Sequence, residues 1–554
     1  MNGFIQMALL ACRCTSENCN RTAICLPYRQ FILDLDCVSR TGLNDAWPFR
    51  TLHTALRKTL FEVSTPRWIL LLGVLMLFRL GLALYLPLDL AGDESYYWEW
   101  GRNLDYGYFS KPPFIGWLMW LLATLQLDSE AGIRVTAALF GGGSLYFLGR
   151  LAADMAGPQQ AFRVVACFGS APFALPSSLF LTIDSPLIFC WSAALLMIWR
   201  SRESDSTVGK DDCILILALT VGVLTKQIML AFIPLWWAWL AVDPARRRRF
   251  KNPKIYLISA IPLAALAIPL WWNSQENWVT LQHTATHFES QTWSGSKALG
   301  WIGAFLGSQW ILWGLISVPI ALQSLIIRKQ GDEAKSFLAM MSLPALALVL
   351  ALASRQNILP NWPAVFWLPV LIWAGLVMSD AWWRRGVLLN ALIQLAIIAA
   401  IFITPHLNIA RTPFDRVSGW ETYAARVTAW DRTIWPDREA VDERRLIIVL
   451  GHRYFASQLA FYHPERPSVR LWEPIDKVST QYGIWNRRNP IQSTEALVIA
   501  TDGRDTLPID LVERWPCIQS LGMETIPVTA GVTRELRLWR AQRDCRNSAV
   551  IPSR

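Results

Sequence analysis

The chain has 554 residues, of which 53% are hydrophobic and only 17% charged, and it contains 30 tryptophans. A chain this long and this apolar exceeds what one soluble core can bury, so the composition predicts a polytopic membrane protein. The formal net charge of +10 could indicate nucleic-acid binding. The basic residues, however, lie mostly between hydrophobic segments and form no tract with interleaved aromatics, which excludes nucleic acid as the expected partner.

The first 66 residues differ from the rest because they contain no long apolar segment. Their opening, MNGFIQMALLA, lacks the basic region of a signal peptide. Cysteines are crowded here, but no second CxxC pair or histidine pair follows that would complete a metal cluster. These cysteines are Cys12, Cys14, Cys19, Cys25 and Cys37. We expect residues 1–66 to be a disordered leader, or to precede the true start of the protein.

Apolar segments of the length needed to cross a bilayer, about twenty residues, begin after this leader. About eleven are found, at 68–86, 134–153, 161–181, 186–199, 213–225, 229–242, 255–272, 298–326, 336–354, 362–379 and 386–404. The sequence therefore predicts a helical membrane domain over residues 67–404.

The basic residues of the short loops indicate which side each loop occupies, because Lys and Arg resist translocation. If the first segment begins inside, the basic loops near 150–163, 200–210, 246–249, 328–335 and 384–385 all lie inside. Residues 93–113, 182–185, 273–299 and 355–361 and the tail then lie outside. The stretch 114–127 has only about fourteen apolar residues, so we expect a helix on the outer interface rather than a span.

The tail from residue 405 to 554 is more charged, and short β-type stretches alternate with helical ones. LIIVLG (446–451) and ALVIAT (496–501) are of the first kind, and GWETYAARVTAW (419–430) is of the second. This pattern predicts a small α/β domain on the outer side. Cys517 and Cys545 both lie in it, and an oxidising compartment would permit a disulfide between them.

The first outer loop carries the most distinctive residues, AGDESYYWEWGRNLDYGYFSKPPFIGW (91–117). Its aromatic residues 96–100 are typical of a helix lying at headgroup depth. Asp93 and Glu94 form an acidic pair, and Lys111 precedes two prolines. A carboxylate at the membrane surface could take a proton from a hydroxyl, and a lysine could hold a departing phosphate. Together they indicate group transfer from a lipid phosphate.

This loop resembles the first outer loop of bacterial polyprenyl-phosphate-sugar glycosyltransferases of the GT-C fold. These enzymes are related to dolichyl-phosphate-mannose protein mannosyltransferases and to the lipid A aminoarabinose transferase. The resemblance covers roughly residues 67–515. Further stretches that carry it are LTIDSPLIFCWSAAL (181–195), GVLTKQIML (222–230), NILPNWPAVFWLPV (357–370), GWETYAARV (419–427), ASQLAFYHPERP (456–467) and QYGIWNRR (481–488).

The resemblance implies roles for particular side chains. Asp93 matches the catalytic carboxylate of the family, and Glu94 completes its acidic pair. Lys111 matches the lysine that contacts the donor phosphate. Asp184, in the second outer loop, matches an acidic residue that organises the site, and we assign Tyr97 the same kind of role.

Other residues are weaker candidates. Lys226 could belong to the site or could only extend from a helix end toward the headgroups, and Gln227 replaces the glycine expected there. His283 and His287 have the i, i+4 spacing of a metal pair, but without an HExxH glutamate an ordinary interfacial helix is favoured. Asn361 is expected to shape the start of the next span. The aminoarabinose relative implies a possible divalent metal, whose ligands the sequence does not assign.

The sequence thus predicts an inverting glycosyltransferase. It would move a sugar from a polyprenyl-phosphate donor to a glycolipid, lipid A or a protein, with Asp93 as general base. Its site would lie on the periplasmic side of the bacterial inner membrane. The alternative is a transporter or flippase of lipid-linked sugars. Transport would favour ionisable residues at the bilayer midplane and paired broken helices, whereas the carboxylates here cluster on outer loops.

Overall fold

The computed structural model describes residues 66–203, 208–286, 294–327, 332–435, 446–474, 478–501 and 503–545. Pro66–Arg554 form one compact unit. The predicted leader, with its five cysteines, lies outside the described residues, and so does His287.

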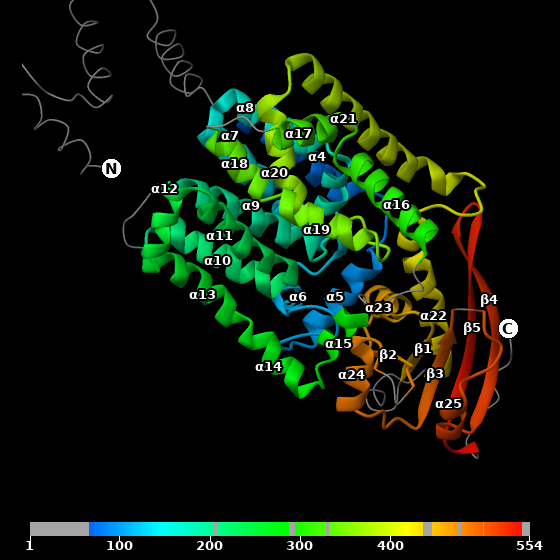
Figure 1. The fold of residues 1–554 in the computed structure, drawn as a ribbon. Coiled ribbons are helices and arrows are strands. Elements are labelled where there is room, and N and C mark those ends of the chain that lie inside the picture. Colours follow the sequence, from blue (N-terminus) through cyan, green and yellow to red (C-terminus); the bar gives the residue numbers. More distant parts are fainter. Residues whose placement is uncertain are drawn as a thin grey trace, which may run out of the picture. The chain divides into compact units, whose positions relative to one another are not determined.

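The part that precedes the tail is helical (Figure 1). Its α-helices are α4 (Arg67–Tyr85), α5 (Gly92–Arg102), α6 (Phe114–Thr124), α7 (Glu130–Ala156), α8 (Pro158–Ser170), α9 (Asp184–Ser201), α10 (Lys210–Thr225), α11 (Phe232–Val242), α12 (Pro244–Arg247), α13 (Pro253–Ala265), α14 (Ala267–Gln275), α15 (Val279–Thr286), α16 (Gly295–Trp313), α17 (Ser317–Ile326), α18 (Glu333–Met340), α19 (Leu343–Ala353), α20 (Ala364–Val377) and α21 (Asp380–Ile403). Short 3₁₀ helices connect some of them, at Pro172–Ala174, Pro176–Ser178, Gln227–Ala231, Arg248–Lys251, Thr404–His406 and Asp415–Val417.

Five helices or collinear helix pairs among the described residues are long and apolar enough to cross a membrane, and the number rises to seven if two bent pairs are counted. The predicted number of eleven spans therefore stays a prediction. Two of the predicted segments are not straight helices. In 161–181 the α-helix ends at Ser170, because Pro172 and Pro176 interrupt it. In 298–326 the chain bends by 107° between α16 and α17.

The centre of the helical part is formed by α9 and α20. The side chains of α9 from Asp184 to Trp199 are buried almost without exception, and those of α20 are buried from Ala364 to Gly375. A helix that is apolar on all sides lies inside a bundle rather than on its surface. Because α9 is packed on all sides, the position of its first residue, Asp184, is fixed by the fold.

The tail forms helices against one sheet, as the sequence predicts. The helices are α22 (Trp420–Ile434), α23 (Arg453–Tyr462), α24 (Gln481–Arg488) and α25 (Ile509–Arg514). The strands are β1 (Ile447–Leu450), β2 (Val469–Leu471), β3 (Glu495–Ala500), β4 (Cys517–Thr529) and β5 (Val532–Gln542), in the order β2-β1-β3-β5-β4. β1 pairs in parallel with β2 and β3, and the β4–β5 hairpin adds antiparallel to β3.

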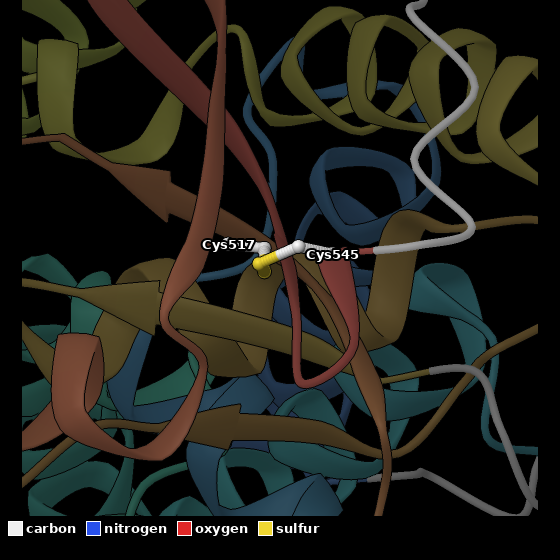
Figure 2. Close-up of a disulfide and its surroundings, with 2 residues drawn as sticks. All are labelled: Cys517 and Cys545. Carbon is white, nitrogen blue, oxygen red and sulfur yellow. A yellow bond between two sulfur atoms is a disulfide. The ribbon is translucent and has the colours of Figure 1, made fainter.

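A disulfide joins Cys517 to Cys545, with the two Cα atoms 5.4 Å apart (Figure 2). It connects the first residue of β4 to the segment that follows β5. The sequence permitted this disulfide but left open whether it forms, and the structure contains it.

The tail packs directly on α5, and this overturns the prediction of an aromatic belt at headgroup depth. Tyr96, Tyr97, Trp98 and Trp100 are each 4% exposed or less. They share a buried cluster with side chains of α22, α23 and α24. These rings are covered by protein because the tail docks on the helix that carries them, a contact that local sequence patterns do not reveal.

Candidate active site

A cavity of about 360 Å³ lies where α5, the α5–α6 loop, the start of α9, the end of α10, α15 and the start of α23 meet. Seven of the residues that the sequence proposes for the site line it, and these are Asp93, Tyr97, Lys111, Asp184, Lys226, His283 and Asn361. The remaining lining residues are Tyr96, Phe109, Ser110, Thr182, Ile183, Leu359, Trp362, Arg453 and Tyr454.

Asp93 is in the first turn of α5, and its side chain is 42% exposed. The hydroxyl of Tyr454 donates a hydrogen bond to Asp93 Oδ1 at 2.9 Å, and Arg453 Nη2 lies 3.7 Å from the same oxygen. Among the described residues, none makes a hydrogen bond to Oδ2. One carboxylate oxygen is therefore held and the other is available to a ligand.

Lys111 also lines the cavity, and it lies in a tight hairpin. Its backbone exchanges two hydrogen bonds with that of Tyr108, and Pro112 and Pro113 follow. Burial, together with the charge of Lys226, lowers the pKa of Lys111 to about 8. Within the described ranges its ammonium has no hydrogen-bond or ion-pair partner. A partly desolvated cation without a counterion is suited to binding a phosphate.

Two helices that are distant from this hairpin in the sequence hold it in place. From α15, the Thr280 hydroxyl donates to the carbonyl oxygen of Tyr108 at 3.0 Å. From α24, the Gln481 side chain accepts the Phe109 N–H at 2.7 Å, while its own backbone N–H donates to the Tyr96 hydroxyl at 2.7 Å. Gln481 thus links the helix that carries Asp93 to the loop that carries Lys111.

On the opposite side of the cavity, the carboxylate of Asp184 is bonded at both of its oxygens. Lys226 Nζ lies 2.7 Å from Asp184 Oδ1, and the amide of Asn361 donates to Oδ2 at 2.6 Å. The side chains of Asp184 and Lys226 are 8% and 12% exposed. Lys226 therefore does not extend toward headgroups, because it is bonded to a buried carboxylate. This geometry is compatible with the organising role that the sequence proposes for Asp184, and it adds a contact to Asn361, which was expected only to shape the start of the next span.

Glu94 does not line the cavity, although it follows Asp93 directly. It is fully buried, and its two oxygens accept the backbone N–H groups of Ala91 and Leu181 at 2.8 and 2.7 Å. Burial raises its pKa to about 7, which Arg134 partly offsets. This geometry favours a role in joining α5 to the segment before Asp184 rather than the catalytic pairing that the sequence suggests.

Tyr97 and His283 complete the cavity wall. Burial, with Asp93 as the next cause, raises the pKa of Tyr97 well above its usual value, so its hydroxyl stays protonated. The His283 ring lies 4.8 Å from that of Phe109. Across the described residues there is no group of three His, Cys, Asp or Glu side chains that could hold a metal ion. His287, the predicted partner of His283, lies outside those residues.

The sequence did not point to Arg453 and Tyr454, which open α23. Arg453 Nη2 donates to the Tyr454 hydroxyl at 3.0 Å, and its guanidinium lies 5.2 Å from the ring centre of Tyr96. The stretch that carried the resemblance begins two residues later, at 456. Because the tail reads as a domain of its own, only its docking on α5 brings these two side chains to Asp93.

The fold and this cavity define a polytopic helical membrane protein with a charged site between loops of its helical part and the start of α23 in the tail. Residues 110–272 match the family described as dolichyl-phosphate-mannose-protein mannosyltransferase. The chain is also similar to the lipid A galacturonosyltransferase RgtD of Rhizobium johnstonii. The two are 27% identical over 334 residues, which cover 57% of this chain and 67% of the relative.

Two solved structures share the fold, and both are of ArnT from Cupriavidus metallidurans. The apo form matches with a TM-score of 0.59 at 16% identity, covering 85% of this chain and 97% of ArnT. The form bound to undecaprenyl phosphate matches with a TM-score of 0.57 at 16% identity, covering 88% and 100%. The predicted resemblance to polyprenyl-phosphate-sugar glycosyltransferases of the GT-C fold is confirmed.

Proposed function

We propose that this protein is a glycosyltransferase that moves a sugar from a polyprenyl phosphate to a lipid acceptor. The observation that carries the proposal is one cavity in which, as far as the structure describes the chain, the ammonium of Lys111 has no direct partner and one oxygen of Asp93 has no hydrogen bond. The similarity to a lipid A galacturonosyltransferase supports sugar transfer and makes lipid A the first acceptor to test. The ArnT structure with undecaprenyl phosphate supports this kind of carrier.

In the proposed reaction Lys111 binds the phosphate that links the sugar to its prenyl chain. Asp93 Oδ2 accepts the proton of the acceptor hydroxyl as that oxygen attacks the anomeric carbon. The bond from the anomeric carbon to the phosphate oxygen breaks, and its electron pair leaves with the phosphate. Lys111 stabilises the charge that develops there. Attack from the face opposite the phosphate inverts the anomeric configuration.

The paired side of the cavity has a different part in this scheme. Asp184 is bonded at both oxygens, so it positions Lys226 and Asn361 rather than taking a proton. Lys226 in turn lowers the pKa of Lys111, the group that meets the phosphate. No nucleotide is needed, because the phosphodiester of the donor supplies the driving force.

The location follows from the same proposal. We place residues 67–404 in the bacterial inner membrane as the catalytic domain and residues 405–554 on its periplasmic side. The basic loops then remain in the cytoplasm, and the disulfide lies in an oxidising compartment. The cavity opens at the periplasmic surface, where a lipid acceptor is accessible.

The experiment uses the purified protein with undecaprenyl phosphate carrying one of several radiolabelled sugars, including a uronic acid, and lipid A in vesicles. We expect one donor to lose its label to lipid A. Asp93→Asn should lower turnover about 10³-fold, the range for loss of general base catalysis. Asp243→Asn is the matched control, because Asp243 caps α12 away from the cavity.

Two results would overturn the proposal. Near-normal turnover by Asp93→Asn would remove Asp93 from the chemistry. Passage of an intact donor across the vesicle bilayer, without transfer, would replace the transferase by a transporter. Label on a protein rather than on lipid A would keep the reaction and change the acceptor.

A further inference from the structure

The contact between α5 and α23 is unusually close where the two helices meet at Asp93. Gly92 precedes Asp93, and a Cβ atom added to Gly92 would lie 2.3 Å from Cγ of the Tyr454 ring. Real Cβ atoms essentially never approach another heavy atom so closely, so the ring occupies space that only glycine leaves open. The residue beside Asp93 is thus matched to an aromatic ring 362 positions further along the chain.

The two helices are held in register one turn further on. The hydroxyls of Ser95 on α5 and Ser457 on α23 lie 2.8 Å apart, and both side chains are buried. Small residues at these positions let the helix backbones approach, and the hydrogen bond fixes how α23 lies along α5. Tyr454, one turn before Ser457, is therefore placed over the first turn of α5 by the fold and not by its own flexibility.

A chain of hydrogen bonds passes from Arg453 through Tyr454 to Asp93. Arg453 Nη2 donates to the Tyr454 oxygen at 3.0 Å, and that hydroxyl uses its only proton to donate to Asp93 Oδ1 at 2.9 Å. A hydrogen bond to a carboxylate fixes its orientation most strongly when its donor cannot turn elsewhere. Here the arginine occupies the acceptor side of the hydroxyl, so its proton is directed to Oδ1.

We propose that Tyr454 is a positioning residue for Asp93. It holds Oδ1 so that Oδ2 faces the acceptor hydroxyl, and Gly92 provides the space that the tyrosine ring requires. The inference rests on the proposed function, in which Asp93 is the base, and it adds the device from the tail that orients this base.

The state of the tyrosine agrees with this role. Burial, with the charge of Asp93 as the next cause, raises the pKa of Tyr454 to about 12. The hydroxyl therefore stays protonated and remains a donor over the whole pH range in which a membrane enzyme is assayed. The contact with Asp93 does not depend on a titration of Tyr454.

A purely structural role for Tyr454 would have different consequences. If the ring only packed α23 on α5, Tyr454→Phe would keep the ring and leave the kinetics unchanged apart from stability. If the hydroxyl orients the base, the same variant keeps the packing but loses the effect on Asp93. The phenylalanine variant therefore separates the two roles without disturbing the helix contact.

The test compares Tyr454→Phe with Tyr462→Phe, on the labelled donor that the wild-type protein consumes. Tyr462 is also on α23, but its hydroxyl bonds Leu90 N and Glu130 outside the cavity. For Tyr454→Phe we expect kcat to fall about 10- to 100-fold with KM for the donor unchanged, in line with loss of a hydrogen bond to a charged group. Tyr462→Phe should keep the kcat of the wild type.

The pH dependence of kcat/KM gives a second readout that packing would not move. A carboxylate that loses a hydrogen-bond donor holds its proton more tightly. The acidic limb of the profile should therefore move to higher pH in Tyr454→Phe and stay in place in Tyr462→Phe. An unmoved limb together with wild-type kcat in Tyr454→Phe would overturn the inference.

Gly92 provides an independent test through a double-mutant cycle. Gly92→Ala should favour helix α5 itself, so a loss of kcat can be assigned to displacement of the Tyr454 ring. In a Tyr454→Ala background the ring is gone, and Gly92→Ala should then add no further loss. Equal losses in both backgrounds would contradict the proposed contact.

Failure of this inference is distinct from failure of the proposed function. If the wild type transfers sugar and Asp93→Asn does not, the function stands whatever Tyr454 does. Absence of transfer by the wild type with every donor would overturn both.

Discussion

The two carboxylates that line the cavity, Asp93 and Asp184, have opposite environments. Asp184 is 8% exposed, and its oxygens are bonded to Lys226 and Asn361. Asp93 is 42% exposed and has one oxygen bonded to Tyr454. The partners of Asp184 lie in the helical part, where Lys226 follows α10 and Asn361 precedes α20, whereas the partners of Asp93 come from the C-terminal tail.

The difference shows which carboxylate can take part in chemistry. A buried carboxylate that is paired at both oxygens is held in place by its partners and is little accessible to a substrate, and breaking the pair would be costly. A half-exposed carboxylate with one fixed oxygen combines a defined orientation with an available acceptor. The same contrast holds for the lysines, since Lys226 is paired and Lys111 is not.

The largest expected effect follows from changing the unpaired cation. Lys111→Met should weaken binding of undecaprenyl phosphate at least 30-fold, because a charge-assisted hydrogen bond is worth about 2 kcal/mol. The lowered pKa means that free Lys111 loses its proton near pH 8 rather than above 10. Wild-type binding should therefore decline above about pH 8, measured by calorimetry in nanodiscs from pH 6 to pH 10.

Lys111→Arg is the control for that titration, because arginine keeps its charge throughout this range. Its affinity should not decline between pH 8 and pH 10, above the range in which the phosphate monoester itself titrates. A bound phosphate stabilises the charged form of Lys111 and so raises its pKa. The affinity of the wild type should therefore decline at or above pH 8, not below it. Unchanged affinity in Lys111→Met would show that the unpaired cation does not meet the phosphate.

On the paired side the expected effect is on stability and not on ligand binding. Asp184→Asn leaves the Lys226 ammonium buried without a carboxylate and should lower the free energy of unfolding by about 3 kcal/mol. Adding Lys226→Met removes the stranded charge and should restore most of that loss. Thermal unfolding in detergent measures both variants. Equal melting temperatures for the wild type and Asp184→Asn would contradict the contrast between the two carboxylates.

The smallest effect concerns Glu94, the buried neighbour of Asp93. Its pKa rises from 4.5 to about 7 on folding, so the folded state binds its proton more tightly. Glu94 therefore contributes stability below pH 4.5 that is lost as the pH rises to about 7, by at most about 3 kcal/mol. Glu94→Gln should remove this part of the pH dependence of unfolding.

The quantity to measure is the difference in the free energy of unfolding between the wild type and Glu94→Gln as a function of pH. Two other buried carboxylates near α5 also titrate close to neutral pH. Burial raises the pKa of Asp89 to about 6 and that of Glu99 to about 8. Their contribution is common to both proteins and cancels. A parallel pH dependence in the two proteins would contradict the assigned role of Glu94.

Much of the fold was predictable because it depends on local patterns. Long apolar runs locate the helices, and the short β-type stretches at 446–451 and 496–501 locate β1 and β3. Breaks within apolar runs were missed where the helix geometry depends on packing. The bend between α16 and α17 occurs at Gly314, whose φ of +125° an L side chain would not favour.

The site was predictable where its residues come from the helical part of the chain. Asp93, Lys111 and Asp184 stand in motifs whose residue types suggest their chemistry, and the cavity brings them together. Arg453 and Tyr454 could not be found in this way, because their role depends on a docking contact between distant segments. The burial of the aromatic residues at 96–100 was misread for the same reason, since one helix sequence does not show what covers it.

The hydrogen bond from Tyr454 to Asp93 spans 361 positions, and that from Gln481 to Tyr96 spans 385. During synthesis, Asp93 and Lys111 leave the ribosome long before these partners exist. A nascent chain that has inserted its helices but not yet released residues 454 and 481 therefore lacks the hydroxyl that holds the carboxylate and one of the two helices that hold the hairpin. Docking of the newly made tail is then the step that converts an inserted but inactive chain into a complete site.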